Sequence, residues 1–342
     1  MRSSNSPEGE LLVGGQALIE GVMMRSPGAY GVAVRRPDGS IAFQRGKVAS
    51  LARRYPFLKL PILRGVAVLF QSLALGIRSL NFSAEQAMPA EQAMPETEKK
   101  AEDAKATGDS GDKSNWAIAG SMAVGLGLGA VVFLLVPLWL TRLSETYLFG
   151  SLSSLGFNLV DGALRALFFL AYIFLISRMK DIHRVFQYHG AEHKVVFAWE
   201  KQVPLTVENA RAQSRLHPRC GTSFLLFVLL VSILVFSFIP KTLPFLVMYG
   251  GRLLLVPVIA GLSYEVLRFT AKHQAAPLFA LLVAPGLALQ RITTQEPTDD
   301  MLEVAIAALE EALREDGILQ DHEMPRMAAD PVAVAAAASL PA

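Results

Sequence analysis

The residue spacing with the clearest chemical meaning in this chain is His189–His193, which reads His-Gly-Ala-Glu-His on a short polar segment. If the segment is helical, at about 100° per residue the two imidazoles and the Glu192 carboxylate share one face. This is the order found in inverzincins, where two histidines bind a divalent metal ion and the glutamate activates water. The spacing therefore predicts a metal site with Glu192 as catalytic base. The alternative is two solvated histidines on one helical turn.

A second polar segment offers further ligands. His217 and Cys220 stand three residues apart, and an imidazole with a thiolate suits zinc. Glu265 is an alternative carboxylate ligand. If all four His and Cys candidates bind, the site is closed and structural, whereas three ligands leave a position for water and permit catalysis. Otherwise Cys220 is a small buried residue at a helix start and Glu265 pairs with Arg268.

Composition predicts a membrane protein. Apolar residues make up 52% of the 342 residues and charged residues only 18%, which is too apolar for an ordinary soluble domain. Met1–Glu10 is polar and no cleavable signal peptide is expected. Because Cys220 is the single cysteine, no intramolecular disulfide framework is possible. Four stretches reach the length of about 20 apolar residues that a bilayer requires: Trp116–Leu140, Gly162–Met179, Thr222–Ile239 and Leu243–Leu262.

The distribution of basic residues predicts the orientation of these spans. Arg and Lys are frequent before the first span and again in 178–219, whereas 141–161 carries only Arg142 and 240–242 only Lys241. By the positive-inside rule, the N-terminus, the His-Glu segment and the C-terminus then face the cytoplasm.

Residues 60–80 are also long and apolar enough to span. Arg64, Gln71 and Arg78 recur every seven residues and mark one helical face, and charges are costly in the hydrocarbon region. We therefore predict an interfacial or re-entrant helix. A fifth span is the alternative, and it would place the basic 178–219 segment outside.

Arg252 lies within the predicted fourth span, beside Gly250 and Gly251, which allow close helix approach. A charge inside the membrane is a functional hypothesis by default. The two interpretations are a structural pairing and a contact with a substrate or lipid headgroup.

The N-terminal region predicts a small β-rich unit. Tyr30–Arg36 and Ser40–Arg45 are strand-like and are joined by the turn signal Pro-Asp-Gly at 37–39. Glu20 is a polar group among apolar neighbours, and we expect it to orient a ligand imidazole, unless it forms a salt bridge in an ordinary β-unit.

The remaining segments complete the predicted organisation. The apolar stretch Pro277–Arg291 is short, so a re-entrant or interfacial piece is expected, and Met301–Asp316 shows the stripe of an amphipathic helix. In chain order we predict a β-rich unit, an interfacial helix, a disordered linker, two spans, a His-Glu-His loop, two spans, a re-entrant piece with a C-terminal helix, and a disordered tail. Their ranges are 11–59, 60–80, 81–115, 116–179, 180–221, 222–265, 266–317 and 318–342.

Four ordered motifs resemble the YqhQ family of bacterial membrane proteins. They cover Val13–Pro27, Tyr188–Lys194, His217–Ser223 and Leu289–Pro297, and the likeness extends over roughly 11–316 apart from 84–113. The family is one of unknown function, usually described as metal-dependent membrane enzymes. The resemblance implies a bacterial plasma (inner) membrane location and a metal ion at His189 and His193, and it implies no substrate.

The predicted fold is an all-α integral membrane bundle of about four transmembrane helices plus interfacial helices, with a small cytoplasmic β-rich N-terminal unit. The predicted function is a metal-dependent hydrolase, with zinc as the expected ion, acting on a lipid headgroup or a juxtamembrane peptide. A non-catalytic, metal-stabilised scaffold or assembly factor is the alternative. A transporter has thinner support, and no nucleic-acid partner is expected.

Overall fold

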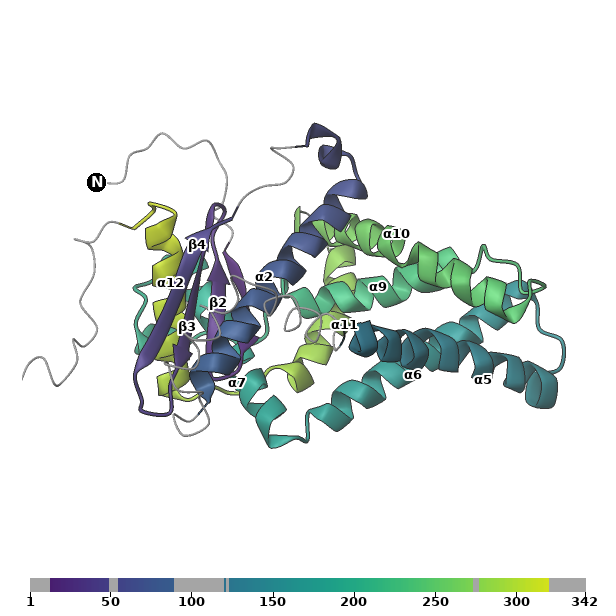
Figure 1. Cartoon of the computed structure of the whole chain (residues 1–342), viewed down its shortest axis with the longest axis horizontal. Coiled ribbons are helices and arrows are strands. Elements are labelled where there is room, and N and C mark those ends of the chain that lie inside the picture. Colours follow the sequence, from purple (N-terminus) through teal and green to yellow (C-terminus); the bar gives the residue numbers. More distant parts are fainter. Residues whose placement is uncertain (1–12, 49–54, 89–119, 121–122, 273–276, 320–342) are drawn as a thin grey trace, which may run out of the picture.

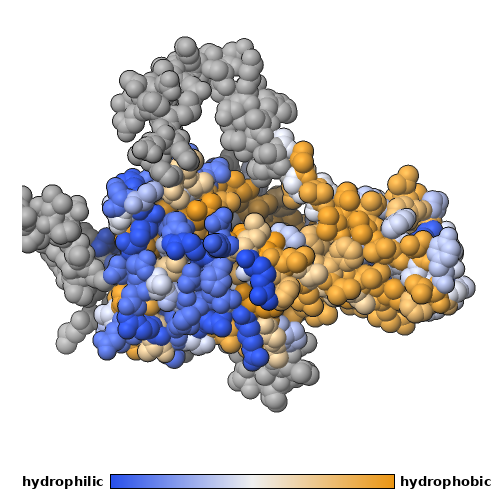
Figure 2. Space-filling view, turned by 90° about the horizontal axis from the view of Figure 1, so that it is seen from below, coloured by the Kyte–Doolittle hydropathy of each residue, from blue (hydrophilic) through white to orange (hydrophobic). Residues whose placement is uncertain are grey.

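The structure, a computed structural model, describes residues 13–48, 55–88, 120, 123–272 and 277–319. It divides into a part built on a small sheet, called the polar part below, and an elongated bundle of helices (Figure 1). Hydrophilic residues gather over the sheet and hydrophobic residues over the bundle (Figure 2). The chain is thus mostly helical with one small sheet near its N-terminus, as predicted.

The sheet has four antiparallel strands in the order of the chain. They are β1 (Gly14–Leu18), β2 (Gly21–Arg25), β3 (Ala29–Arg35) and β4 (Ile41–Lys47). The two strands expected around the Pro-Asp-Gly turn are β3 and β4, so that prediction is confirmed. Leu18 pairs with Gly21 across a two-residue turn, in which Glu20 takes a positive φ of 51°.

Both faces of the sheet are covered, because its central strands are apolar on both sides. Val22, Met24 and Ala33 face α7 (Lys180–Glu200) and α12 (Asp299–Glu315), and the alternate residues Met23 and Val32 belong to a second core under α2 (Leu63–Ala87). Period-2 alternation along a strand separates the two sets of side chains. The predicted stripe of α12 is buried in the first core, which confirms the amphipathic helix.

Helix α2 contacts both parts of the molecule. Its C-terminal half lies on the sheet, where Ser83 Oγ accepts a hydrogen bond of 3.0 Å from the Ile19 N–H and Phe82 joins the second core. Its N-terminal half lies along α10 (Phe245–Lys272), and a Cβ on Gly65 would meet the Gly261 carbonyl at 2.8 Å. The linker predicted from residue 81 is wrong for 81–87. These residues are the last turns of α2, which the contacts of Phe82 and Ser83 hold against the sheet. From residue 89 the predicted linker lies outside the described residues.

The bundle contains the most apolar helices. Its first helix, Ala123–Phe149, includes the π-helical turns η2 (Val131–Leu135) and η3 (Glu145–Phe149) on either side of α5 (Val136–Ser144). The others are α6 (Ser154–Ile176), α9 (Gly221–Phe236), α10 and α11 (Pro277–Thr293).

Four helices of the described residues are long and apolar enough to cross a membrane: Leu63–Ala87, Ala123–Phe149, Ser154–Ile176 and Phe245–Thr270. Three of them overlap predicted spans. Helix α9 is apolar but only 16 residues long, so the span predicted at 222–239 is shorter than expected, and α2 takes its place in the set of four.

A network of buried charges links α6, α9 and α10. Arg252 donates to Asp161 Oδ2 (2.7 Å) and to Asn158 Oδ1 (2.8 Å). Arg165 also pairs with Asp161 and donates to Ser232 Oγ (2.8 Å). These contacts favour the structural-pairing interpretation of Arg252. Arg165 also lies within a predicted span, Gly162–Met179, but its position in the sequence did not indicate this pairing.

Candidate metal site

The segment predicted as a polar loop at 180–221 is largely helical, and that loop prediction is wrong. Helix α7 occupies Lys180–Glu200, and the short α8 follows at Val207–Arg211. Helix α7 forms because one of its faces, including Ala191 and Val195, joins the core with α12 and the sheet. The condition for a shared face of His189, Glu192 and His193 is therefore met.

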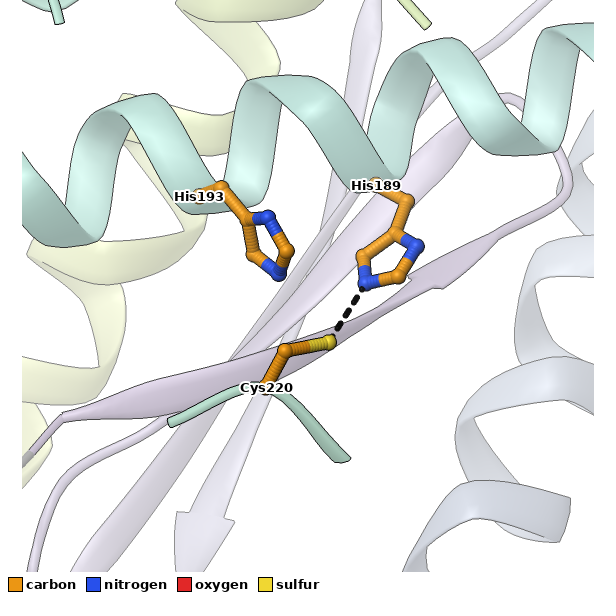
Figure 3. A group of neighbouring side chains, drawn as sticks. All are labelled: His189, His193 and Cys220. Carbon is orange, nitrogen blue, oxygen red and sulfur yellow. Dashed lines mark hydrogen bonds between the residues drawn. The ribbon is translucent and has the colours of Figure 1, made fainter. Parts of the chain in front are cut away.

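The His189 ring is held in one tautomer. Its Nδ1 lies 2.8 Å from the carbonyl oxygen of Thr293, at the end of α11. Because a carbonyl only accepts hydrogen bonds, Nδ1 carries the proton and donates. The Nε2 atom is left with a lone pair and points at Cys220 Sγ, 3.1 Å away (Figure 3).

His193 repeats this arrangement deeper in the protein. Its Nδ1 lies 2.5 Å from the Arg215 carbonyl oxygen and donates to it. Burial lowers the pKa of His193 and so favours the neutral ring, and the nearby Cys220 partly offsets this shift. Its Nε2 is buried and has no hydrogen-bond partner within the described part of the chain. An unpartnered buried acceptor is costly, and it calls for an explanation.

Cys220 completes the cluster from another element. It is the N-cap of α9, and its Sγ accepts a hydrogen bond of 3.4 Å from the Thr222 N–H. A helix N-terminus stabilises a thiolate. One ligand atom from each of His189, His193 and Cys220 lies within 4.8 Å of the other two, and all three side chains converge on one point (Figure 3).

Glu192 lies at the edge of this cluster. Its Oε2 is 3.5 Å from His193 Nε2. Burial raises the pKa of Glu192, partly offset by the nearby His189. A cavity of about 390 Å³ reaches Glu192 and the three clustered residues, and β1 forms one wall of it. A Cβ on Gly15 of that strand would lie 3.1 Å from Glu192 Cγ, so the glycine provides space beside the carboxylate.

Two predicted ligands are engaged elsewhere. His217 Nδ1 accepts from the Arg219 N–H at 3.2 Å, so its Nε2 carries the proton and faces Glu200 Oε2 at 3.3 Å. Glu265 forms an ion pair with Arg64 of α2 at 2.5 Å, rather than with Arg268. Each of these two side chains therefore has a partner outside the cluster, which consists of His189, His193 and Cys220.

Of the two interpretations of Glu20, the structure shows the salt bridge. Its carboxylate forms a two-pronged ion pair with Arg184 at 2.5 Å and approaches the Tyr188 hydroxyl at 3.4 Å. This ion pair connects the β1–β2 turn to α7, and the Glu20 carboxylate contacts neither the His189 nor the His193 ring. The Thr293 and Arg215 carbonyls orient the imidazoles instead. Sequence reasoning missed them because backbone oxygens carry no residue-type signal.

This architecture is that of a helical protein with four potential spans, a small sheet and a His-His-Cys cluster, in which His193 and Cys220 are buried, beside a carboxylate. The chain belongs to the family described as "Protein of unknown function (DUF1385)", whose model matches residues 60–315. It is 37% identical to the "Uncharacterized protein YqhQ" of Bacillus subtilis (strain 168) over 317 residues, 91% of this chain and 95% of that one. This confirms the resemblance to the YqhQ family. No solved structure matches the chain.

Gly190 of α7 lies in close contact with the segment after α11, whose Thr293 carbonyl orients His189. A Cβ at this position would lie 2.1 Å from the Gln295 carbonyl oxygen, so the backbones must separate. We expect Gly190→Ala to destabilise the protein by about 1–3 kcal/mol, as overpacking does. Thermal unfolding in detergent measures the effect. Gly251→Ala in α10 is the matched control, since a Cβ there meets nothing within 4 Å. Equal melting temperatures for the two variants would contradict the expectation.

Proposed function

We propose that His189, His193 and Cys220 bind a divalent metal ion, with zinc as the expected ion. The observation that carries the proposal is the buried Nε2 of His193, which has no hydrogen-bond partner among the described residues and lies beside the His189 Nε2 and the Cys220 thiol. A metal ion would satisfy that atom. Two neutral imidazoles and a thiolate suit zinc, and carbonyl partners on the opposite ring nitrogens are typical of zinc-binding histidines.

We further propose that the site is catalytic and hydrolytic. Three protein ligands leave a fourth position open, which distinguishes catalytic from structural zinc sites. When bound, the ion would supply Lewis acidity toward an oxygen atom. The raised pKa of Glu192 suits a base that takes a proton from water in the cavity and passes it to the leaving group.

The position of the cluster supports a membrane-associated substrate. Cys220 directly precedes the apolar helix α9, and the Thr293 carbonyl that orients His189 lies at the end of α11. The cluster therefore lies where the polar part of the molecule meets the bundle. With the orientation that the basic residues predict, this junction faces the cytoplasm. The substrate would be a lipid headgroup or a juxtamembrane peptide.

A structural role is the second candidate, because the ligands come from both parts of the molecule. His189 and His193 belong to α7, which packs on the sheet, whereas Cys220 begins a helix of the bundle. A metal ion held between them would fix the two parts together. This arrangement supports a metal-stabilised scaffold or assembly factor.

Glu192→Gln separates the two candidates. The protein is purified without chelators, and its metal content is measured by mass spectrometry together with complementation of a deletion strain. We expect the variant to keep its metal and its melting temperature but to lose function, because the amide cannot accept the proton. Glu208→Gln, on the exposed surface of α8, is the control. Full function in Glu192→Gln would favour the scaffold. A wild-type protein without metal would contradict both candidates.

A further inference from the structure

A second cavity, of about 190 Å³, is lined in part by Pro218 and Arg219, in the segment that carries Cys220. Arg219, Tyr264, Leu267, Arg268 and Val283 contribute to its lining, which therefore combines two guanidinium groups with apolar side chains. The residues come from α10, α11 and the segment just before α9. It is thus built from the bundle at its junction with the polar part.

The charge of this cavity is positive. Arg268 is exposed and has no ion-pair partner among the described residues. The nearest acid along α10, Glu265, is already paired with Arg64, and Arg219 is paired with Glu200. No acidic side chain lines the cavity in the described ranges. A negatively charged ligand would therefore meet an uncompensated guanidinium.

The cavity also adjoins the proposed metal site. Arg219 lines both this cavity and the larger one that contains His193 and Glu192. Arg268 lies near the end of the potential span Phe245–Thr270, at the level where headgroups would lie if that helix crosses a bilayer. A ligand held by Arg268 would place its neighbouring atoms near the cluster.

We propose that this cavity binds the phosphate group of an anionic lipid, with its apolar portion along Leu267 and Val283. Arginine is well suited to phosphate because its planar donors match the oxygens in pairs. Basic side chains at a membrane surface also attract anionic lipids. An anionic lipid would then be the substrate class of the proposed hydrolase. Its role as a substrate rests on the proposed function, whereas its binding to this cavity does not.

Arg268→Gln tests the binding directly. Full-length protein in neutral detergent is titrated with phosphatidylglycerol or phosphatidylcholine, and bound lipids are counted by native mass spectrometry. We expect the wild type to prefer phosphatidylglycerol and Arg268→Gln to bind it at least about fivefold more weakly. Arg178→Gln is the matched control, because Arg178 is an exposed arginine just beyond the end of α6.

Three results would overturn the proposal. They are equal binding by wild type and Arg268→Gln, an equal loss in Arg178→Gln, and displacement of the lipid by millimolar inorganic phosphate with the same dependence on Arg268. The last result would assign the cavity to a free phosphate.

The metal content of the same samples separates this inference from the proposed function. Lipid binding that depends on Arg268 in a metal-free wild type would leave the lipid site standing while the hydrolase proposal fails. A metal-loaded protein whose lipid binding does not depend on Arg268 would leave the proposed metal site standing while the lipid site fails.

Discussion

Replacing His193 by Ala should abolish binding of the proposed metal ion, whereas replacing His217 by Ala should leave that binding intact. The two rings are neighbours, with centroids 5.7 Å apart, and both are buried. Only the Nε2 of His193 has a lone pair directed at the cluster, because the Nε2 of His217 faces Glu200. Removing a partner that merely orients a ligand costs 10–100-fold in metal affinity. Removing the ligand itself should therefore cost more than about 100-fold.

The measurement is zinc affinity by competition with a chromophoric chelator, on variants whose folding is checked by circular dichroism. Cys220→Ser should also weaken binding strongly, since a hydroxyl replaces the thiolate. An equal loss in His217→Ala and His193→Ala would show that His217 is a ligand, and our assignment of the three ligands would be wrong.

Replacing Asp161 by Asn should give the largest loss of stability within the bundle. The carboxylate lies between the guanidinium groups of Arg165 and Arg252, and all three side chains are buried. The same two guanidinium groups lie over the ring of Phe236, at 4.7 and 5.0 Å from its centroid. The amide would leave two buried cations without a counter-charge. Breaking a buried ion pair in this way costs about 3–5 kcal/mol.

Unfolding in mixed micelles measures this loss, with Asp181→Asn on the exposed surface of α7 as the control. Combining Asp161→Asn with Arg252→Gln should restore part of the stability, because the double variant removes one of the two surplus cations. A double variant less stable than the sum of the single changes would indicate that charge balance is not the cause. A single Asp161→Asn variant as stable as the wild type would also contradict the role of charge balance.

The parts of the protein that could be predicted from sequence are those encoded by local periodicity. Alternation and a turn signal located β3 and β4, and the apolar stripe located α12, because a strand repeats every two residues and a helix every 3.6. His189 and His193 follow the same rule, since four residues on a helix always return to one face. Three of the four long apolar helices were also predictable, whereas the fourth, α2, was expected to be an interfacial or re-entrant helix.

Only the tertiary structure decided which candidate ligands meet. His217 and Cys220 are three residues apart, yet Cys220 caps α9 with its sulfur toward the histidines while His217 turns to Glu200. Spacing along a non-helical segment does not fix the direction of a side chain. The carbonyls that set the imidazole tautomers come from positions far along the chain from their histidines.

The packing of α2 and the pairing of the buried charges also depend on contacts between residues far apart in the sequence. Helix α2 has one continuous pattern, but its two halves pack against different parts of the molecule, so its apolar surface could not be assigned to lipid or protein from sequence. Asp161 and Arg252 are 91 positions apart and become partners only when α6 and α10 pack together. Local sequence determines the helices and strands, whereas long-range packing determines which polar atoms are left facing one another.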